Sequence, residues 1–246
     1  MKCRVTSRDT VTVPTRCPSA PTLAYGPRFH VEPPARAEVR DVMNDDREQR
    51  QRLQDLVRAI AASPHNLVSA RAKEELGSRH IPECESFARL LAGPGPVLDL
   101  GAGGGLPGLV IAIVRPELEV HLMEATAKKV SFLQETAATL GLMVQVHHGR
   151  AEEMGRGALR GAYGIVTARA VAPLERLVGW AAPYLAPGGR LYAIKGERWA
   201  EEVAAACTAL RRSGLEVAGD PAQDPQLGPD AADPHRPRVV MLARSS

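Results

Sequence analysis

Aromatic residues are scarce in this sequence, since Phe, Trp and Tyr together make up only 4% of its 246 residues. Hydrophobic residues still reach 44%, so aliphatic side chains must build the core. The length suits one α/β domain with a small appendage, or two small domains. The few cysteines do not have the spacing of metal ligands or of a disulfide framework, which favours reduced thiols and predicts no metal site; they are Cys3, Cys17, Cys84 and Cys207.

Long hydrophobic runs are also missing. No apolar run reaches the ~18 residues of a membrane-spanning helix, and the N-terminus lacks the apolar segment of a secretory signal. We therefore expect a cytoplasmic protein that does not enter a membrane. The formal net charge is only +3, and residues 1–40 carry +4, which leaves −1 for the rest. A basic surface for nucleic acid would therefore have to be local.

The first part of the chain divides at about residue 43. Residues 1–43 show no apolar periodicity and predict either a disordered tail or a misassigned gene start, because Met43 stands just before a capped helix. Asn44 or Asp45 can cap that helix, which we expect to end at Ala62. Two shorter helices are expected over 73–79 and 82–91. The sequence therefore predicts a small N-terminal helical subdomain over 44–95.

Strand and helix patterns alternate over residues 96–246. Apolar segments that fit strands begin at residues 97, 120, 144, 164 and 190. Such alternation predicts parallel strands joined by crossover helices. Two further strands, 215–219 and 238–242, follow each other and predict a closing antiparallel pair. The expected fold is α/β, with a doubly wound, mostly parallel seven-stranded sheet. In the helix before residue 214, Cys207 is expected to lie in the core.

The segment VLDLGAGGGLPG, residues 97–108, predicts a binding loop. Gly101 and Gly103 let the backbone turn sharply and approach a ligand at the carboxyl end of the first strand. Residues 103–108 also satisfy the pattern G-x-G-x-x-G of dinucleotide-binding proteins. Glu124 ends the second strand, and an acid there can bind both ribose hydroxyls of either nicotinamide cofactors or S-adenosylmethionine (SAM). Asp99 within LDLGAG and the antiparallel ending favour SAM.

These motifs together resemble one family. LDLGAGGGLPGLVIAIVRPE and KKVSFLQETAATLGL are similar to the bacterial 16S rRNA guanine-N7 methyltransferases of the RsmG (GidB) family. Further matches are Asn66-Leu67, Arg79-His80, the Arg169 of TARAVAPL and the Lys195-Gly196 of YAIKG. The resemblance spans about residues 53–242 and implies the Rossmann-like fold of class I SAM-dependent methyltransferases. The Asp-Ser expected after Arg-His is Glu85-Ser86 here.

The resemblance also implies functional residues, each at the position that matches the family's motif. It implies that the cofactor SAM contacts Gly101, Leu106, Ala151, Glu152 and Arg169, with Glu124 as the acid after the second strand. Together with Asp99 and Gly103, these are the expected cofactor-binding residues.

Guanine N7 already carries a lone pair, so methyl transfer to it needs neither a general base nor a metal, and alignment should dominate catalysis. Arg169 and Lys195, expected at the ends of the fourth and fifth strands, are the predicted catalytic residues. Arg169 can bind guanine O6, a phosphate or the SAM carboxylate, and Lys195 a phosphate or base.

The expected partner is 16S rRNA, either free or in an assembling 30S subunit. The candidates for a local basic surface are Arg71, Arg79, Lys128, Lys129, Arg150, Arg169, Lys195 and Arg198. Three alternatives remain open at this point: a SAM-dependent methyltransferase of a small molecule, a nicotinamide-dependent oxidoreductase, and a SAM-binding regulator without turnover.

Overall fold

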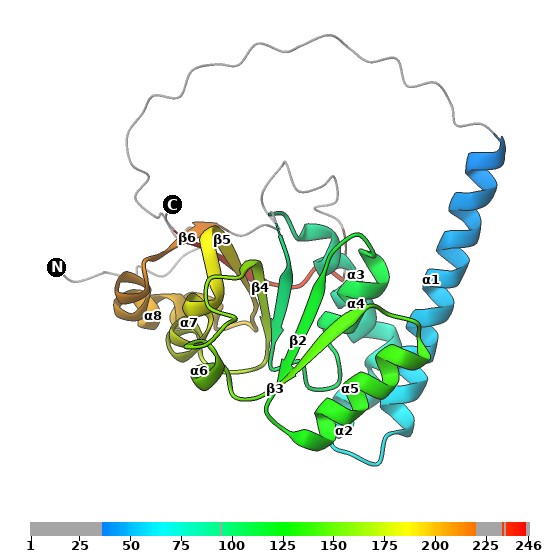
Figure 1. Ribbon diagram of the computed structural model, residues 1–246, viewed down its shortest axis with the longest axis horizontal. Coiled ribbons are helices and arrows are strands. Elements are labelled where there is room, and N and C mark those ends of the chain that lie inside the picture. The colour runs from blue at the N-terminus through cyan, green and yellow to red at the C-terminus, as the bar shows by residue number, and fades with distance from the viewer. Residues whose placement is uncertain (1–35, 94, 220–232, 234, 245–246) are drawn as a thin grey trace, which may run out of the picture.

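A seven-stranded sheet forms the centre of the molecule (Figure 1). The computed structural model describes residues 36–93, 95–219, 233 and 235–244, with side chains from residue 45 onward. The strand order is β3-β2-β1-β4-β5-β7-β6, and β7 alone runs in the opposite direction to the other strands. The strands are β1 (Val97–Leu100), β2 (Val120–Glu124), β3 (Val144–His148), β4 (Tyr163–Arg169), β5 (Leu185–Ile194), β6 (Leu215–Gly219) and β7 (Val239–Arg244). The predicted α/β fold is confirmed, including its antiparallel ending.

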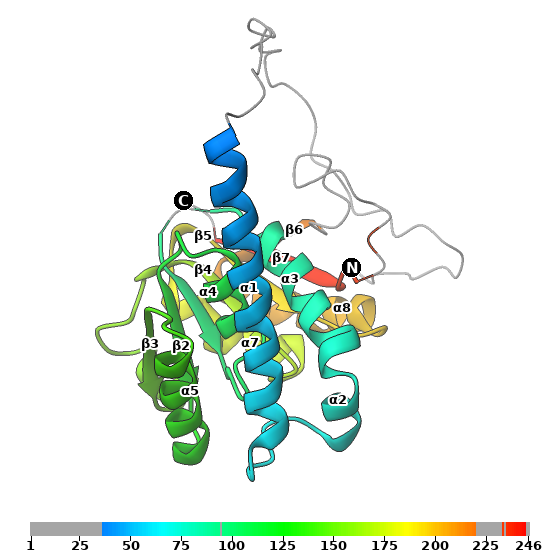
Figure 2. The same cartoon turned by 90° about the vertical axis from the view of Figure 1, so that its right-hand side faces the viewer.

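Helices cover both faces of the sheet (Figures 1 and 2). They are α1 (Arg36–Ala62), α2 (Ala70–Glu74), the π-helical turn η1 (Leu76–His80), α3 (Ile81–Leu90), α4 (Gly108–Val114), α5 (Ala127–Thr139), α6 (Ala151–Met154), α7 (Leu174–Ala181), the 3-10 turn η2 (Ala182–Tyr184) and α8 (Trp199–Ser213). No helix in the described ranges is both long and apolar enough to cross a membrane.

Helix α1 begins at Arg36, so the helix start predicted at residue 44 is wrong. A capping residue starts a helix only if the chain before it leaves the helical conformation, and no proline or glycine interrupts residues 36–44. Figure 2 shows the first half of α1 extending beyond the body of the molecule. Its second half packs inward through Leu53, Leu56 and Ile60, all of which are buried. The rest of the predicted tail, residues 1–35, lies outside the described residues.

The N-terminal helices share a hydrophobic cluster with the sheet. Leu56, Phe87 and Ile111 belong to one cluster that reaches Val97 on β1, while α7 and α8 contribute to a second cluster on the other face. The Tyr192 hydroxyl on β5 donates to the Ala92 carbonyl after α3 over 2.7 Å, which ties the helical region to the sheet.

The core position predicted for Cys207 is wrong. This residue is exposed on α8, while Ala206 and Leu210 are the residues of that helix that are buried. The buried face contains Ala206 and Leu210, with Trp199 and Val203 partly buried beside them. Cys207 is the residue after Ala206, about 100° around the helix, and lies outside this face.

Asp99 holds the start of α4 against the sheet. Its side chain is buried, and its two carboxylate oxygens accept hydrogen bonds from the Gly108 amide (3.0 Å) and the Thr167 hydroxyl (2.9 Å). Burial raises the pKa of Asp99 to about 7, although both hydrogen bonds and Arg169 act in the opposite direction. A β-carbon at Gly108 would lie 2.7 Å from the same carboxylate, so only glycine allows this close approach.

Asp99 should make the stability of the fold depend on pH. Because its folded pKa is raised, the folded protein keeps a proton that the unfolded chain releases above about pH 4, so the free energy of unfolding falls as pH rises to about 7. Between pH 5 and pH 8 this amounts to about 3 kcal/mol. We expect Asp99→Asn to lose this dependence in urea unfolding at the two pH values. A variant with the same pH dependence as the unaltered protein would contradict the assignment.

Candidate functional site

The glycine loop after β1 lies against the acid that ends β2. The Gly103 amide donates to one carboxylate oxygen of Glu124 over 3.0 Å, and the Thr126 amide donates to the other over 2.8 Å. Gly101 has a φ of +71° and Gly103 of +56°, a region that glycine enters without strain. Glu124 is buried but still has free lone pairs, since an ionised carboxylate offers about four acceptor sites.

A cavity of about 160 Å³ opens beside this loop at the carboxyl ends of β1, β2 and β3. Its polar lining includes Glu124 and Glu152, while Leu100 and Met123 contribute apolar surface. The complete lining is Leu100, Gly101, Met123, Glu124, Ala125, Gly149, Arg150, Ala151, Glu152, Val171 and Trp180. An acid, bare backbone and apolar side chains converge here, as is typical of cofactor sites in doubly wound sheets.

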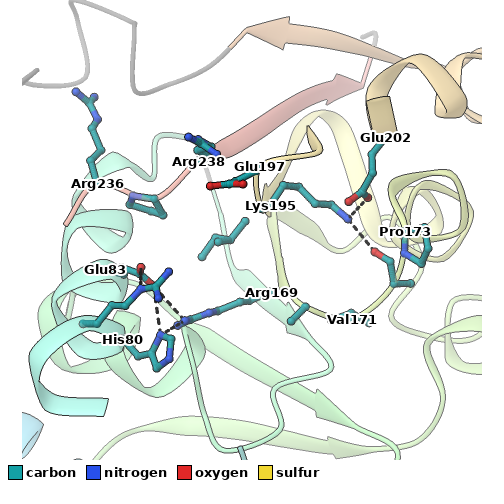
Figure 3. Close-up of a pocket in the computed structure, with 16 residues that line it drawn as sticks. His80, Glu83, Arg169, Val171, Pro173, Lys195, Glu197, Glu202, Arg236 and Arg238 are labelled. Atoms are coloured by element: carbon teal, nitrogen blue, oxygen red, sulfur yellow. Dashed lines mark hydrogen bonds and ion pairs between the residues drawn. The ribbon is translucent and has the colours of Figure 1, made fainter. Parts of the chain in front are cut away.

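A larger cavity of about 740 Å³ lies next to the first, at the carboxyl ends of β4 and β5 (Figure 3). Val171 lines both cavities. The preceding residue, Ala170, has a φ of +53°, which is unusual for a residue with a β-carbon. Backbone in such sparsely populated conformations clusters at functional sites.

Arg169, the last residue of β4, points across the larger cavity toward α3 (Figure 3). Its guanidinium forms an ion pair with Glu83 at 3.1 Å and donates to Nδ1 of His80 at 2.5 Å and to Sγ of Cys84 at 3.0 Å. Burial raises the pKa of Cys84 to about 12, so this thiol stays neutral. Arg169 therefore joins the N-terminal helices to the centre of the sheet.

Lys195, the residue after β5, is also held by partners within the chain (Figure 3). Its ammonium donates to the Ala172 carbonyl and to Glu202 on α8, each over 2.8 Å, and the same Glu202 oxygen accepts from the Leu174 amide at the start of α7. Burial raises the pKa of Glu202, but the bonds from Lys195 and Leu174 outweigh it, so the pKa lies below its ordinary value. Lys195 thus fixes the segment between β4 and α7.

Comparison with known proteins assigns the chain to one family. Residues 47–222 match the family described as GidB, rRNA small subunit methyltransferase G. The chain is 37% identical over 234 residues to the ribosomal RNA small subunit methyltransferase G of Kineococcus radiotolerans, which covers 94% of this chain and 87% of that protein. It is 42% identical over 169 residues to the protein of the same name from Thermobifida fusca, covering 68% and 70%. The chain belongs to the rRNA small subunit methyltransferase G family.

Solved structures outside this family share the fold. The [4+2]-cyclase SpnF is 18% identical with a TM-score of 0.52, over 82% of this chain and 96% of that one. The mitomycin 7-O-methyltransferase MmcR is 17% identical with a TM-score of 0.51, over 72% and 59%. At such identities the likeness concerns the arrangement of sheet and helices alone.

Most of the cofactor residues that the methyltransferase G motifs imply lie around the smaller cavity. Gly101, Glu124, Ala151 and Glu152 line it directly, and Gly103 is bonded to Glu124 behind it. Leu106 is half-buried in the loop and packs against the core cluster instead, among the residues that line neither cavity. Asp99 is buried below the loop with both oxygens bonded, so it supports the loop from within.

The predicted basic residues are divided between surfaces. Arg79, Arg169 and Lys195 line the larger cavity, Arg150 lines the smaller one, and Lys128 lies in a separate groove beside the end of α1. Arg71, Lys129 and Arg198 are not among the residues that line either cavity. In the described ranges, no group of three or more His, Cys, Asp or Glu side chains could hold a metal ion.

Sequence reasoning did not find several residues of the site. Arg236 and Arg238, just before β7, line the larger cavity, as do Glu83 and Glu202, which pair with the two predicted catalytic residues. Val171 and Trp180 were also missed. Two signals were available: the cluster HRPR at 235–238, with two arginines close to the start of the last strand, and the segment TARAVAPL, which contains Val171.

Replacing Lys195 should weaken the fold and the site together. We expect Lys195→Met to lower the free energy of unfolding by about 1–2 kcal/mol, because Glu202 keeps the Leu174 amide but loses its cation. Methyl transfer should fall in kcat, with the KM for rRNA within about twofold of the unaltered value. Glu202→Gln should act in the same direction. Unchanged stability with a much higher KM for rRNA would instead indicate a direct contact of Lys195 with phosphate.

Proposed function

We propose that this protein transfers a methyl group from SAM to N7 of a guanine in 16S rRNA. The observation that carries the proposal is the pair of adjoining cavities in a member of this family. One is small and has an acid at its wall, the other is large and basic, and Val171 belongs to both. A cofactor in the first and a nucleotide in the second would meet at that side chain, which is the proximity that methyl transfer requires.

The residues around the smaller cavity fit SAM. Glu124 retains lone pairs for ribose hydroxyls, and Glu152 offers a carboxylate for an exocyclic amine. A β-carbon at Gly101 would lie 2.9 Å from a Val171 methyl group, so glycine allows the loop to approach Val171 this closely. We assign Gly101, Ala151, Glu152 and Glu124 to direct cofactor contacts. Gly103, Leu106 and Asp99 shape the loop that holds it, and Arg169 borders the cofactor from the larger cavity.

When bound, SAM supplies an electrophilic methyl group on a sulfonium. The chain's own task is then to bind and align a nucleophile, since guanine N7 needs no proton removed. Arg169 is suited to this because its guanidinium lies at the cavity and its position is set by Glu83 and His80. A guanidinium can donate to guanine O6, which is next to N7 on the same base edge.

The larger cavity has the charge expected of an RNA-binding surface. Five basic side chains line it against three carboxylates, and two of those carboxylates are already paired with Arg169 and Lys195. Arg79, Arg236 and Arg238 belong to the lining from two distant parts of the chain. The target guanine must leave its stack to reach the cofactor, which favours a substrate whose rRNA is still accessible, such as an assembling 30S subunit.

The test is methyl transfer from labelled SAM to three substrates that lack this modification: free 16S rRNA, a partly assembled 30S particle and the mature 30S subunit. We expect label in the partly assembled particle first, and strand scission at the labelled guanine after borohydride and aniline, which cleave at N7-methylguanosine. Label at another atom would overturn the N7 assignment. Label only in small molecules, or binding of NAD but not SAM, would overturn the proposed function.

A further inference from the structure

Trp180 lies at the smaller cavity in a protein that has little aromatic surface. It is located near the end of α7 and is the only aromatic residue among those that line this cavity in the described structure. Other parts of the lining come from the end of β2 and from the segment 149–152. The side chain is half-exposed, although the other large residues of α7 that face the sheet, Leu174, Leu177 and Val178, are buried.

The guanidinium of Arg176 lies over the indole ring of Trp180. Its guanidinium carbon lies 5.0 Å from the centre of the Trp180 ring, one helical turn earlier on α7. A cation at this distance is attracted by the π-electrons and favours this orientation of the ring. The ring is thus held at the cavity without being covered by the core, which is what a stacking surface for a planar ligand requires.

We propose that Trp180 is the adenine-binding surface of the cofactor site, with Arg176 as its positioning residue. This inference rests on the proposed use of SAM. The cavity offers what a purine with an exocyclic amine needs: an aromatic ring, the apolar side chains of Leu100 and Met123, and the Glu152 carboxylate. None of the other aromatic residues of the described structure lines this cavity, so no second ring substitutes for Trp180 there.

The chain is well suited to a spectroscopic test because it contains only two tryptophans, Trp180 and Trp199. Trp199 begins α8 and lines neither cavity. We expect Trp199→Phe, which leaves Trp180 as the only indole, to change its fluorescence on SAM addition, saturating at the Kd that calorimetry gives. Trp180→Phe, in which only Trp199 fluoresces, should show no fluorescence change on SAM addition. The proposal would be overturned if Trp199→Phe binds SAM in calorimetry but shows no fluorescence change.

The affinities provide the second arm. Loss of stacking in Trp180→Ala should raise the Kd for SAM about ten- to hundredfold, while Trp180→Phe should stay within about fivefold of the unaltered protein. The KM for rRNA should stay within about twofold in both. Thermal unfolding shows whether each variant folds; if Trp180→Ala does not, Trp199→Phe and Trp180→Phe still decide. Equal SAM affinity in a folded Trp180→Ala would overturn the inference alone, whereas no SAM binding by the unaltered protein would overturn the proposed function as well.

Discussion

Arg169→Ala is expected to reduce methyl transfer to rRNA by roughly 1000-fold with the fold intact. The fold should persist because Glu83 keeps a second cation, Arg79, at 2.9 Å, so no carboxylate is left without a partner. Transfer should fail because the guanidinium at the end of β4 is the basic group that both faces the larger cavity and lies two residues from Val171. The measurement is single-turnover transfer at saturating SAM, with the free energy of unfolding recorded for the same sample.

Two further variants define what Arg169 contributes. Arg169→Lys keeps the charge but loses the planar fork, so we expect it to recover only part of the rate, about tenfold above Arg169→Ala. Arg79→Ala removes a half-exposed arginine of the same cavity and should raise the KM for rRNA with little change in kcat. Full activity of Arg169→Ala would contradict the assignment of Arg169 to the active site.

Gly101→Ala should abolish SAM binding at accessible concentrations, a loss of at least about 100-fold. Two effects combine here. The positive φ of +71° strains any residue with a β-carbon, by about 1 kcal/mol, and the added methyl would stand 2.9 Å from the side chain of Val171 at the smaller cavity. Calorimetry with SAM measures the loss of cofactor affinity, and urea unfolding measures the loss of stability.

Gly141→Ala is the matched control for this variant. Gly141, after α5, has a φ of +64°, and nothing lies within 4 Å of an added β-carbon there. It should therefore lose the same ~1 kcal/mol of stability as Gly101→Ala through backbone strain, with normal SAM affinity. Equal SAM affinity of the two variants would show that the loop at Gly101 does not approach the cofactor.

The sequence predicted the sheet because its signals are local. Most strands are apolar runs close to a glycine or proline, and the longer crossover helices carry their own periodicity, so the order of elements follows without knowledge of distant contacts. The same holds for the glycine loop and for Glu124, which are recognisable from spacing alone. The start of α1 and the position of Cys207 on α8 were wrong because several helix starts and helix faces fit those segments equally well.

The partners of the site residues could not be predicted from the sequence, for a different reason. Arg169 meets His80, Glu83 and Cys84 from 85 to 89 positions away, and Asp99 meets Thr167 from 68 positions away. No periodicity encodes such pairs; they follow from how strands and helices are placed in space. For this reason Arg169 and Lys195 could be proposed as site residues from the sequence, whereas the carboxylates that pair with them could not.

Val171 has a consequence for the order of events during turnover. Val171 lines both cavities, so a molecule bound in one cavity would contact a side chain that the molecule in the other cavity also contacts. Thermodynamic linkage makes this influence mutual. If bound SAM raises the affinity for the nucleic acid by some factor, the bound nucleic acid raises the affinity for SAM by the same factor. Val171→Ala should therefore weaken the binding of the donor and of the nucleic acid together.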